Sequence, residues 1–172
     1  DGFGRTIEGW SRDPQGDVKV VSVYDALSRV RQVSNPYRPS AGESPVYTTT
    51  TFDLAGRVLT VTTPDTATVT TAYSGNQVRV TDQAGKQRLS QTGALGWLTD
   101  VWEITAAAET GVTEAVTFNG SALNGYRTKY QYDALSNLKT VTQQAGTAGT
   151  MQTRTFNYDS LSRLTSATNP ES

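Results

Sequence analysis

Residues 24–30 read Tyr-Asp-Ala-Leu-Ser-Arg-Val, and the same pattern returns twice later in the chain. Residues 132–138 read Tyr-Asp-Ala-Leu-Ser-Asn-Leu, and residues 158–164 read Tyr-Asp-Ser-Leu-Ser-Arg-Leu. A fourth copy at 52–58 begins with Phe and has Gly where the others have Ser. The chain opens inside a fifth copy, since residues 1–5 read Asp-Gly-Phe-Gly-Arg. An internal repeat therefore governs any interpretation of this sequence.

Weaker copies fill the gaps between these five. Residues 92–98 read Thr-Gly-Ala-Leu-Gly-Trp-Leu and lack the Tyr, the Asp and the Arg, while another degenerate unit surrounds Tyr73. Measured between aromatic positions, the steps run from 19 to 28 residues, apart from one step of 40 between Thr92 and Tyr132. That step is twice 20, so we predict one repeat-array domain over residues 1–172, built of about 6–7 units.

Each unit reads as a strand, a tight turn and a second strand. Before a turn, apolar and aromatic residues alternate, as in Val18, Val20 and Tyr24, and Thr alternates after it. The chain holds 28 Thr, 16 Val and 8 Tyr, residue types that favour a pleated surface. We therefore predict an all-β fold, an antiparallel array of consecutive hairpins forming a curved, open spiral sheet.

The turn chemistry explains the conserved spacing within each copy. Asp at the first position of a type I turn accepts hydrogen bonds from nearby backbone N–H groups, and Gly at the fourth adopts the left-handed conformation that closes a bulged hairpin. Ser28, Ser136 and Ser162 take the Gly position, where a left-handed backbone costs about 1–2 kcal/mol, so a modified turn is an equal alternative.

Arg follows Asp by four residues in most copies, so the pair can bridge the turn. An exposed pair contributes only about 0–1 kcal/mol, so we attribute its recurrence to turn geometry and to stacking between neighbouring hairpins. The recurring Tyr is interpreted as a packing element, offset-stacked on its equivalents in adjacent repeats.

Composition excludes several classes of function. The 172 residues include no His and no Cys, which removes disulfides, thiol nucleophiles, Ser-His-Asp chemistry and most zinc sites. A net charge of −1 argues against nucleic-acid binding, and no apolar run is long enough for a transmembrane helix. We expect no catalytic, cofactor-binding or metal-binding residues, and no enzymatic activity.

Two local features suggest sharper hypotheses. Trp97 and Trp102 lie beside Asp100 and Glu103, as on a glycan-binding surface or in a glycosidase, but strand alternation puts the two Trp on opposite faces. We interpret this stretch as a degenerate repeat strand whose large side chains fill the interior. Asp13 and Asp17 resemble calcium ligands, although a solvated hairpin loop is the preferred interpretation.

Residues 37–45 and 143–152 are predicted to be long loops, and residues 104–116 a loop or edge insertion.

The repeat resembles the YD-repeat or Rhs family, whose signature runs Tyr-Asp-x-x-Gly-Arg-Leu with a period of about 20 residues. The departures are the Ser-for-Gly turns, Asn137 and the eroded copy at 92–98. The resemblance covers almost the whole chain and is carried by Asp1, Arg5, Tyr24, Asp25, Arg29, Phe52, Asp53, Gly56, Arg57, Tyr73, Tyr132, Asp133, Tyr158, Asp159 and Arg163.

In complete members of that family the hairpin ribbon closes into a hollow shell that encloses or displays a C-terminal domain. The resemblance thus implies a non-catalytic wall segment of a secreted or cell-surface protein, without the C-terminal core or a toxin domain. Its expected partners are the flanking repeats and the C-terminal domain of a longer parent chain. Two alternatives stay open: a carbohydrate-binding or adhesion module with exposed Tyr and Trp, and self-assembly through open edge strands.

Overall fold

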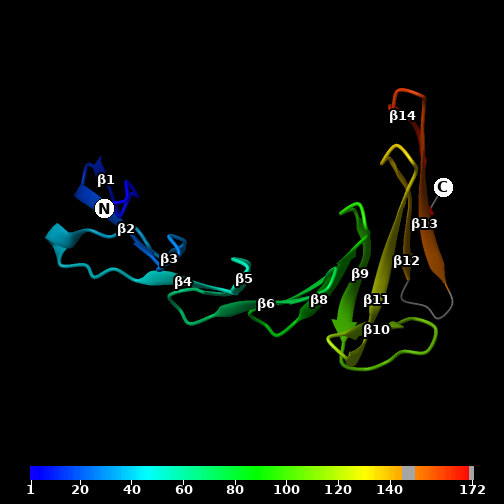
Figure 1. Ribbon diagram of the computed structural model, residues 1–172, viewed down its shortest axis with the longest axis horizontal. Coiled ribbons are helices and arrows are strands. Elements are labelled where there is room, and N and C mark those ends of the chain that lie inside the picture. Colours follow the sequence, from blue (N-terminus) through cyan, green and yellow to red (C-terminus); the bar gives the residue numbers. More distant parts are fainter. Residues whose placement is uncertain (145–149, 171–172) are drawn as a thin grey trace. The chain divides into compact units, whose positions relative to one another are not determined.

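The structure is a computed structural model that describes residues 1–144 and 150–170. These residues contain fourteen β-strands and one short 3-10 helix (Figure 1). The chain divides into two compact units, Asp1–Thr71 and Ala72–Ser172. The strand pairs are antiparallel and join consecutive strands, except that β9 pairs with β11, so the predicted all-β array of antiparallel hairpins is confirmed.

The hydrogen-bonded strand order follows the sequence, β1 through β9 and then β11 through β14, with β10 paired to β11. In the first unit the elements are β1 (Glu8–Asp13), β2 (Gly16–Tyr24), β3 (Val30–Ser34), η1 (Pro39–Ala41), β4 (Tyr47–Phe52) and β5 (Val58–Thr62). Strand β6 (Thr68–Ser74) runs through the division between the units. The second unit continues with β7 (Gln77–Thr81), β8 (Gln87–Thr92), β9 (Leu98–Thr105), β10 (Glu114–Phe118), β11 (Ser121–Tyr132), β12 (Leu138–Gln144), β13 (Met151–Tyr158) and β14 (Leu164–Thr168).

A register shift precedes five of the repeat turns, in each case at the last residue of the strand. The shifts fall at Tyr24, Phe52, Thr92, Tyr132 and Tyr158, which are the aromatic positions of the repeat and its eroded copy. A bulge of this kind bends the strand and increases its twist next to the turn. The predicted bulged hairpin is therefore confirmed, and the bulge shifts the strand register by one residue at the aromatic position.

The second unit holds a hydrophobic core. Leu89 on β8, Trp102 on β9 and Phe118 on β10 are buried together, and Ile104 and Leu123 pack against them. Leu89 and Trp102 are directly paired across two strands. The hairpin of β10 and β11 thus supplies apolar side chains that cover one face of β8 and β9.

Close approach of the backbone makes this arrangement depend on a glycine. Gly125 on β11 pairs with Ile104 of β9 and with Glu114 of β10. A Cβ atom added at Gly125 would lie 2.7 Å from the backbone oxygen of Glu103. Only glycine therefore lets β11 contact both neighbours here without a shift of the backbone.

The first unit has a different basis for its stability. Among its residues Ser34 alone is buried, and the strands otherwise present half-buried and exposed side chains. The Ser34 hydroxyl accepts a hydrogen bond of 2.8 Å from the backbone N–H of Val21, which satisfies the buried oxygen. Strand pairing and contacts between turns hold this unit together without a buried apolar cluster.

Three loop predictions are adjusted by the structure. The loop predicted at 37–45 contains η1, which ends at Gly42 in the left-handed conformation. The loop predicted at 143–152 is too wide, because Gln143 and Gln144 belong to β12 and β13 begins at Met151; residues 145–149 lie outside the described residues. The insertion predicted at 104–116 narrows to residues 106–113, between β9 and β10.

Replacing Leu89 should destabilise the second unit strongly. We expect Leu89→Ala to lower the free energy of unfolding by about 2–5 kcal/mol, because the fully buried side chain leaves a cavity. The measurement is urea denaturation followed by Trp fluorescence. The matched control is Val61→Ala on β5, which is half-buried and should cost less; equal losses would contradict a core confined to the second unit.

Candidate functional site: the turn edge of the sheet

The repeat turns that begin with Asp are closed by the same set of hydrogen bonds. In the turn at 25–29, Asp25 and Arg29 pair through the backbone, and one carboxylate oxygen of Asp25 accepts the N–H groups of Leu27 and Arg29, both at 2.9 Å. The same carboxylate contacts recur in the turns at 1–5, 133–137 and 159–163. The aspartate carboxylate therefore accepts hydrogen bonds from two backbone N–H groups that have no strand partner in the tight turn and would otherwise bind water.

The fourth turn residue is left-handed in every copy. Gly56 has a φ of 83°, and Ser28, Ser136 and Ser162 have φ of 63°, 71° and 58°. The serines thus adopt the glycine conformation, and the alternative of a modified turn does not apply. Two of the serine hydroxyls also accept hydrogen bonds from an earlier turn, from Arg5 at Ser28 and from Asn137 at Ser162.

The second carboxylate oxygen binds the arginine four residues later. The Nε to Oδ2 distance is 2.7 Å in the turns that begin at Asp1, Asp25, Asp53 and Asp159. Binding through Nε leaves Nη1 of Arg5 and of Arg29 free to donate to the next turn, so the ion pair orients the arginine. The pKa values of Asp25, Asp53, Asp133 and Asp159 lie below the ordinary value, chiefly because the backbone N–H of the fifth turn residue donates to the carboxylate.

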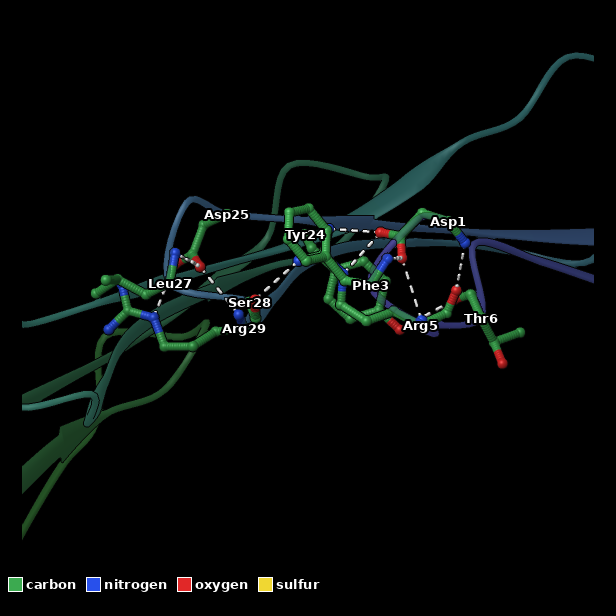
Figure 2. Close-up of polar contacts among 9 residues, drawn as sticks. All are labelled: Asp1, Phe3, Arg5, Thr6, Tyr24, Asp25, Leu27, Ser28 and Arg29. Atoms are coloured by element: carbon green, nitrogen blue, oxygen red, sulfur yellow. Dashed lines mark hydrogen bonds and ion pairs between the residues drawn. The ribbon is translucent and has the colours of Figure 1, made fainter.

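The oriented arginine reaches forward to the next turn on the same edge, as Figure 2 shows for the first two turns. The Arg5 guanidinium carbon lies 4.6 Å from the centre of the Tyr24 ring, and its Nη1 donates to the Ser28 hydroxyl at 3.0 Å. Arg29 repeats this contact, 4.5 Å from the Phe52 ring, and donates to the backbone oxygen of Asp53. The turn at 1–5 is therefore joined to the turn at 25–29, and that turn to the one at 53–57.

The aromatic residue returns a hydrogen bond to the turn before it. The Tyr24 hydroxyl donates to the backbone oxygen of Thr6, which follows Arg5, at 2.9 Å (Figure 2). In the second unit the Tyr132 hydroxyl donates to the backbone oxygen of Leu98, also at 2.9 Å. Both acceptors occupy the same place, directly after the fifth residue of the preceding turn.

The eroded copy keeps this contact with different chemistry. Trp97 occupies the arginine position, and its ring lies 5.2 Å from that of Tyr132 at an interplanar angle of 38°. Asn137 also occupies the arginine position, and its amide donates to Asp133 and to Ser162 of the next turn. The fifth turn residue thus contacts the following turn in both units, whether it is Arg, Trp or Asn.

These contacts correct the prediction for the recurring Tyr. Tyr24 and Phe52 are covered by the arginine of the preceding turn and are not offset-stacked on one another. Trp97 and Tyr132 do form a ring pair, but Trp97 stands at the arginine position of its turn. The reason is the distance along the edge, because equivalent turns are separated by two strands, or about 9–10 Å, and a guanidinium fills the space between rings.

Two turns of similar construction escaped the sequence analysis. The turn at 82–86 has the Asp-x-x-Gly spacing, and the Asp82 carboxylate accepts the N–H groups of Ala84 and Lys86. The turn at 63–67 is closed by Thr63 and Ala67, with Thr66 left-handed at a φ of 70°. Neither follows an aromatic residue, and both lie at the sheet edge opposite the repeat turns of their own unit. The spacing Asp82-x-x-Gly85-Lys86 was a signal that could have revealed the first.

The remaining predicted residues are placed as follows. Tyr73 lies on β6 just before the tight turn at 75–76, and Tyr158 ends β13 before the turn at 159–163. Trp97 is half-buried in the turn edge, whereas Trp102 is buried in the core and Asp100 is bound by Arg127 at 2.6 Å. The two Trp therefore form no shared platform.

Asp13 and Asp17 do not face a common site. Asp13 pairs with Arg38, and Asp17 lies 3.7 Å from Arg12. Across the described part of the chain, no three residues of the types His, Cys, Asp and Glu gather in a way that suits a metal ion. No helix in the same part is long and apolar enough to cross a membrane.

A paired exchange at the left-handed position should shift stability in opposite directions. We expect Ser136→Gly to raise the free energy of unfolding by about 1 kcal/mol, since the left-handed strain is removed. Gly85→Ser, where a Cβ atom meets no atom within 4 Å, should lower it by about the same amount. Urea denaturation measures both, and a change of the same sign in the two variants would contradict the strain argument.

Acid should weaken the turns. Because the folded pKa of Asp133 lies below its unfolded value of about 3.9, the stabilisation is present above that pH and is lost as pH falls through the folded value. We expect the denaturation midpoint to fall below about pH 4 and to fall less steeply in Asp133→Asn, which keeps the acceptor oxygen but does not titrate. Asp17→Asn is the control, and equal slopes for Asp133→Asn and the unmodified chain would refute this origin.

Comparisons with known proteins agree with this geometry at the level of the fold. No family model matches the chain, and no curated protein matches it. The crystal structure of TcdB2-TccC3-TEV matches with a TM-score of 0.57 and 14% identity over 97% of this chain and 12% of that one. The crystal structure of TcdB2-TccC3-Cdc42 gives a TM-score of 0.42 and 11% identity over 89% of this chain and 10% of that one. The crystal structure of TcdB2-TccC3 without its hypervariable C-terminal region gives a TM-score of 0.37 and 10% identity over 91% of this chain and 11% of that one. The chain therefore has the fold of a segment of the first of these proteins and spans about an eighth of its length.

Proposed function

We propose that the chain is a non-catalytic wall segment of a YD- or Rhs-type β-shell, in a longer protein that encloses or displays a separate domain. The observation that carries the proposal is the forward contact along the turn edge, in which Arg5 holds Tyr24 and Arg29 holds Phe52. The similarity of fold to the TcdB2-TccC3-TEV chain supports it, since 97% of this chain aligns with 12% of that one.

The geometry suits a wall because successive hairpins can be added to the same sheet one after another. Each hairpin adds two strands to the ladder and one turn to the edge, and the edge contact supplies a specific join to the previous hairpin. The wall can therefore be extended without a growing hydrophobic core. In the first unit this is the observed situation, because no apolar side chain is fully buried there among the described residues.

In this proposal the acidic residues of the repeat stabilise the turns. Asp25 and Asp53 each bind backbone N–H groups and an arginine, and their lowered pKa values keep them ionised as acceptors. A general acid requires a raised pKa, so these carboxylates suit turn closure and not acid catalysis. The flanking repeats and a C-terminal domain of the parent chain are the partners that we propose, in a secreted or cell-surface protein.

The carbohydrate-binding alternative has weaker support than the wall. The repeat aromatics Tyr24 and Phe52 are half-buried and have a guanidinium over the ring. Trp10 is exposed, but the Lys19 ammonium lies 5.0 Å from its ring centre. A cation over one face leaves at most the other face of each ring for stacking on a sugar.

Protease protection tests the proposal in the natural gene product that contains these residues. We expect the segment that follows the repeats to be cleaved at least about tenfold more slowly in that product than as an isolated peptide, because a wall excludes the protease. Arg29→Asp, which places a negative charge against Asp25 and the Phe52 ring, should abolish much of the protection.

The matched control is Arg31→Asp, on the exposed side of β3 and two residues away. It should leave protection unchanged. Equal cleavage of the following segment inside and outside the full product would overturn the enclosing role. Retention of the product on immobilised saccharide, lost in Tyr24→Ala, would favour the adhesion alternative.

A further inference from the structure

The strand that follows a repeat turn pairs with the next aromatic strand in a constant register. Gln32 stands three residues after Arg29, the fifth turn residue, and pairs with Thr49. Thr49 in turn stands three residues before Phe52. The same relation gives four further pairs: Glu8 with Val21, Thr60 with Thr70, Asp100 with Lys129, and Thr140 with Thr155. Arg, Trp and Asn at the fifth turn position all keep this register, so it belongs to the repeat and not to one residue.

This register brings the fifth turn residue against the next aromatic ring. We call the strand that ends in the aromatic residue the incoming strand. The Arg5 guanidinium carbon lies 4.6 Å from the centre of the Tyr24 ring. The Arg29 guanidinium carbon lies 4.5 Å from the centre of the Phe52 ring. Backbone pairing and the side-chain contact therefore select the same alignment of the incoming strand.

Strand β14 has the position of a strand that receives an incoming strand, but its outer edge is uncovered. It pairs with β13 and stands last in the strand order. All five residues of β14 are exposed. All seven residues of β12, which follows an equivalent turn and lies between two strands, are half-buried. The outer backbone groups of β14 therefore have no ladder partner within residues 1–144 and 150–170.

Arg163 is already oriented for the contact with an incoming strand. Its Nε donates to Oδ2 of Asp159 at 2.7 Å, as the arginine does in the other turns that contain one. The Arg163 side chain is nevertheless 73% exposed, compared with 24% for Arg5 and 26% for Arg29, which cover a ring. Arg163 and the edge of β14 thus repeat the arrangement of an occupied edge, without a ring from the described part of the chain.

A second folded copy of the chain does not offer the strand that fits this edge. The incoming strands are β2, β4, β6, β11 and β13, and each of them already has a hydrogen-bonded strand on both sides. The strand that completes the edge of β14 must therefore lie outside these folded residues.

We propose that the outer edge of β14, together with Arg163, is a binding site for an extended segment that ends in an aromatic residue. The segment adds an antiparallel strand through backbone hydrogen bonds, and its aromatic residue supplies the specificity. Its ring lies against the Arg163 guanidinium when the residue three positions earlier pairs with Ser166. The occupant in the natural protein is the incoming strand of the following hairpin. The inference rests on the proposed wall function for this occupant and deepens it, because it names the side chain and the register that select the next strand.

A synthetic peptide of residues 16–28 provides an incoming strand for the test, since it contains β2 with Tyr24 and most of the following turn. We expect the 172-residue chain to bind this peptide in fluorescence anisotropy. Arg163→Ala in the chain should weaken binding at least about fivefold, with an unchanged circular dichroism spectrum, and so should Tyr24→Ala in the peptide. Tyr24→Phe should weaken it less than Tyr24→Ala, because Phe52 makes the same contact without a hydroxyl. The matched control is Arg88→Ala, which removes an exposed, ion-paired arginine of β8 and should leave the affinity unchanged.

Cysteine cross-linking tests the register, because the chain has no Cys of its own. Ser166→Cys in the chain should form a disulfide with a peptide that carries Val21→Cys, three positions before Tyr24. A peptide that carries Ser22→Cys should not, since neighbouring side chains of a strand point to opposite faces. Equal cross-linking of the two peptides would overturn the proposed register.

A chain that does not bind the peptide, or that binds it equally well after Arg163→Ala, would overturn the proposal. Protease protection of the natural product is measured separately. Protection without peptide binding would remove this inference and leave the wall function. Peptide binding that depends on Arg163, without protection, would remove the enclosing role and leave the strand-binding site.

Discussion

In each complete repeat turn, one aspartate carboxylate has two tasks. One oxygen accepts backbone N–H groups of the turn, and the other holds the Nε of the arginine that closes it, as in Asp25 and Arg29. The first task stabilises a tight, bulged reversal of the chain. The second fixes the direction of a long side chain that would otherwise lose considerable rotamer entropy on ordering. The ion pair is therefore better understood as an orienting device than as a source of stability.

The oriented guanidinium connects one hairpin to the next. Its flat face covers an aromatic ring while its edge donates to the polar groups of the following turn, which is the combination that distinguishes Arg from Lys. Where the repeat has lost its arginine, Trp97 covers the ring of Tyr132, and Asn137 retains the polar half of the contact. The contact between successive turns is thus kept even where a different residue makes it.

The two units show two ways to stabilise the same ladder. The first relies on strand pairing and turn contacts, while the second adds the cluster of Leu89, Trp102 and Phe118. The addition comes from the long excursion between β9 and β11, whose β10 strand folds back onto β11 and brings Phe118 over the sheet. A degenerate stretch of the repeat array, with weak signature residues, is accordingly where the structure departs most from a simple ribbon.

Sequence alone determined the hairpin periodicity, the position of the repeat turns and the residues that close them, but not the turns at 63–67 and 82–86. These features depend on hydrogen bonds between residues at most four apart, so a contiguous motif such as Tyr24 to Val30 encodes them completely. Only the tertiary structure decided what each arginine contacts, that the rings are covered by guanidinium and not by one another, and that the turn at 82–86 lies at the opposite edge. Contacts between turns join residues 18 to 35 positions apart, as for Tyr24 with Thr6 and Trp97 with Tyr132. Their geometry follows from strand register across the sheet, which a local pattern of residues does not specify.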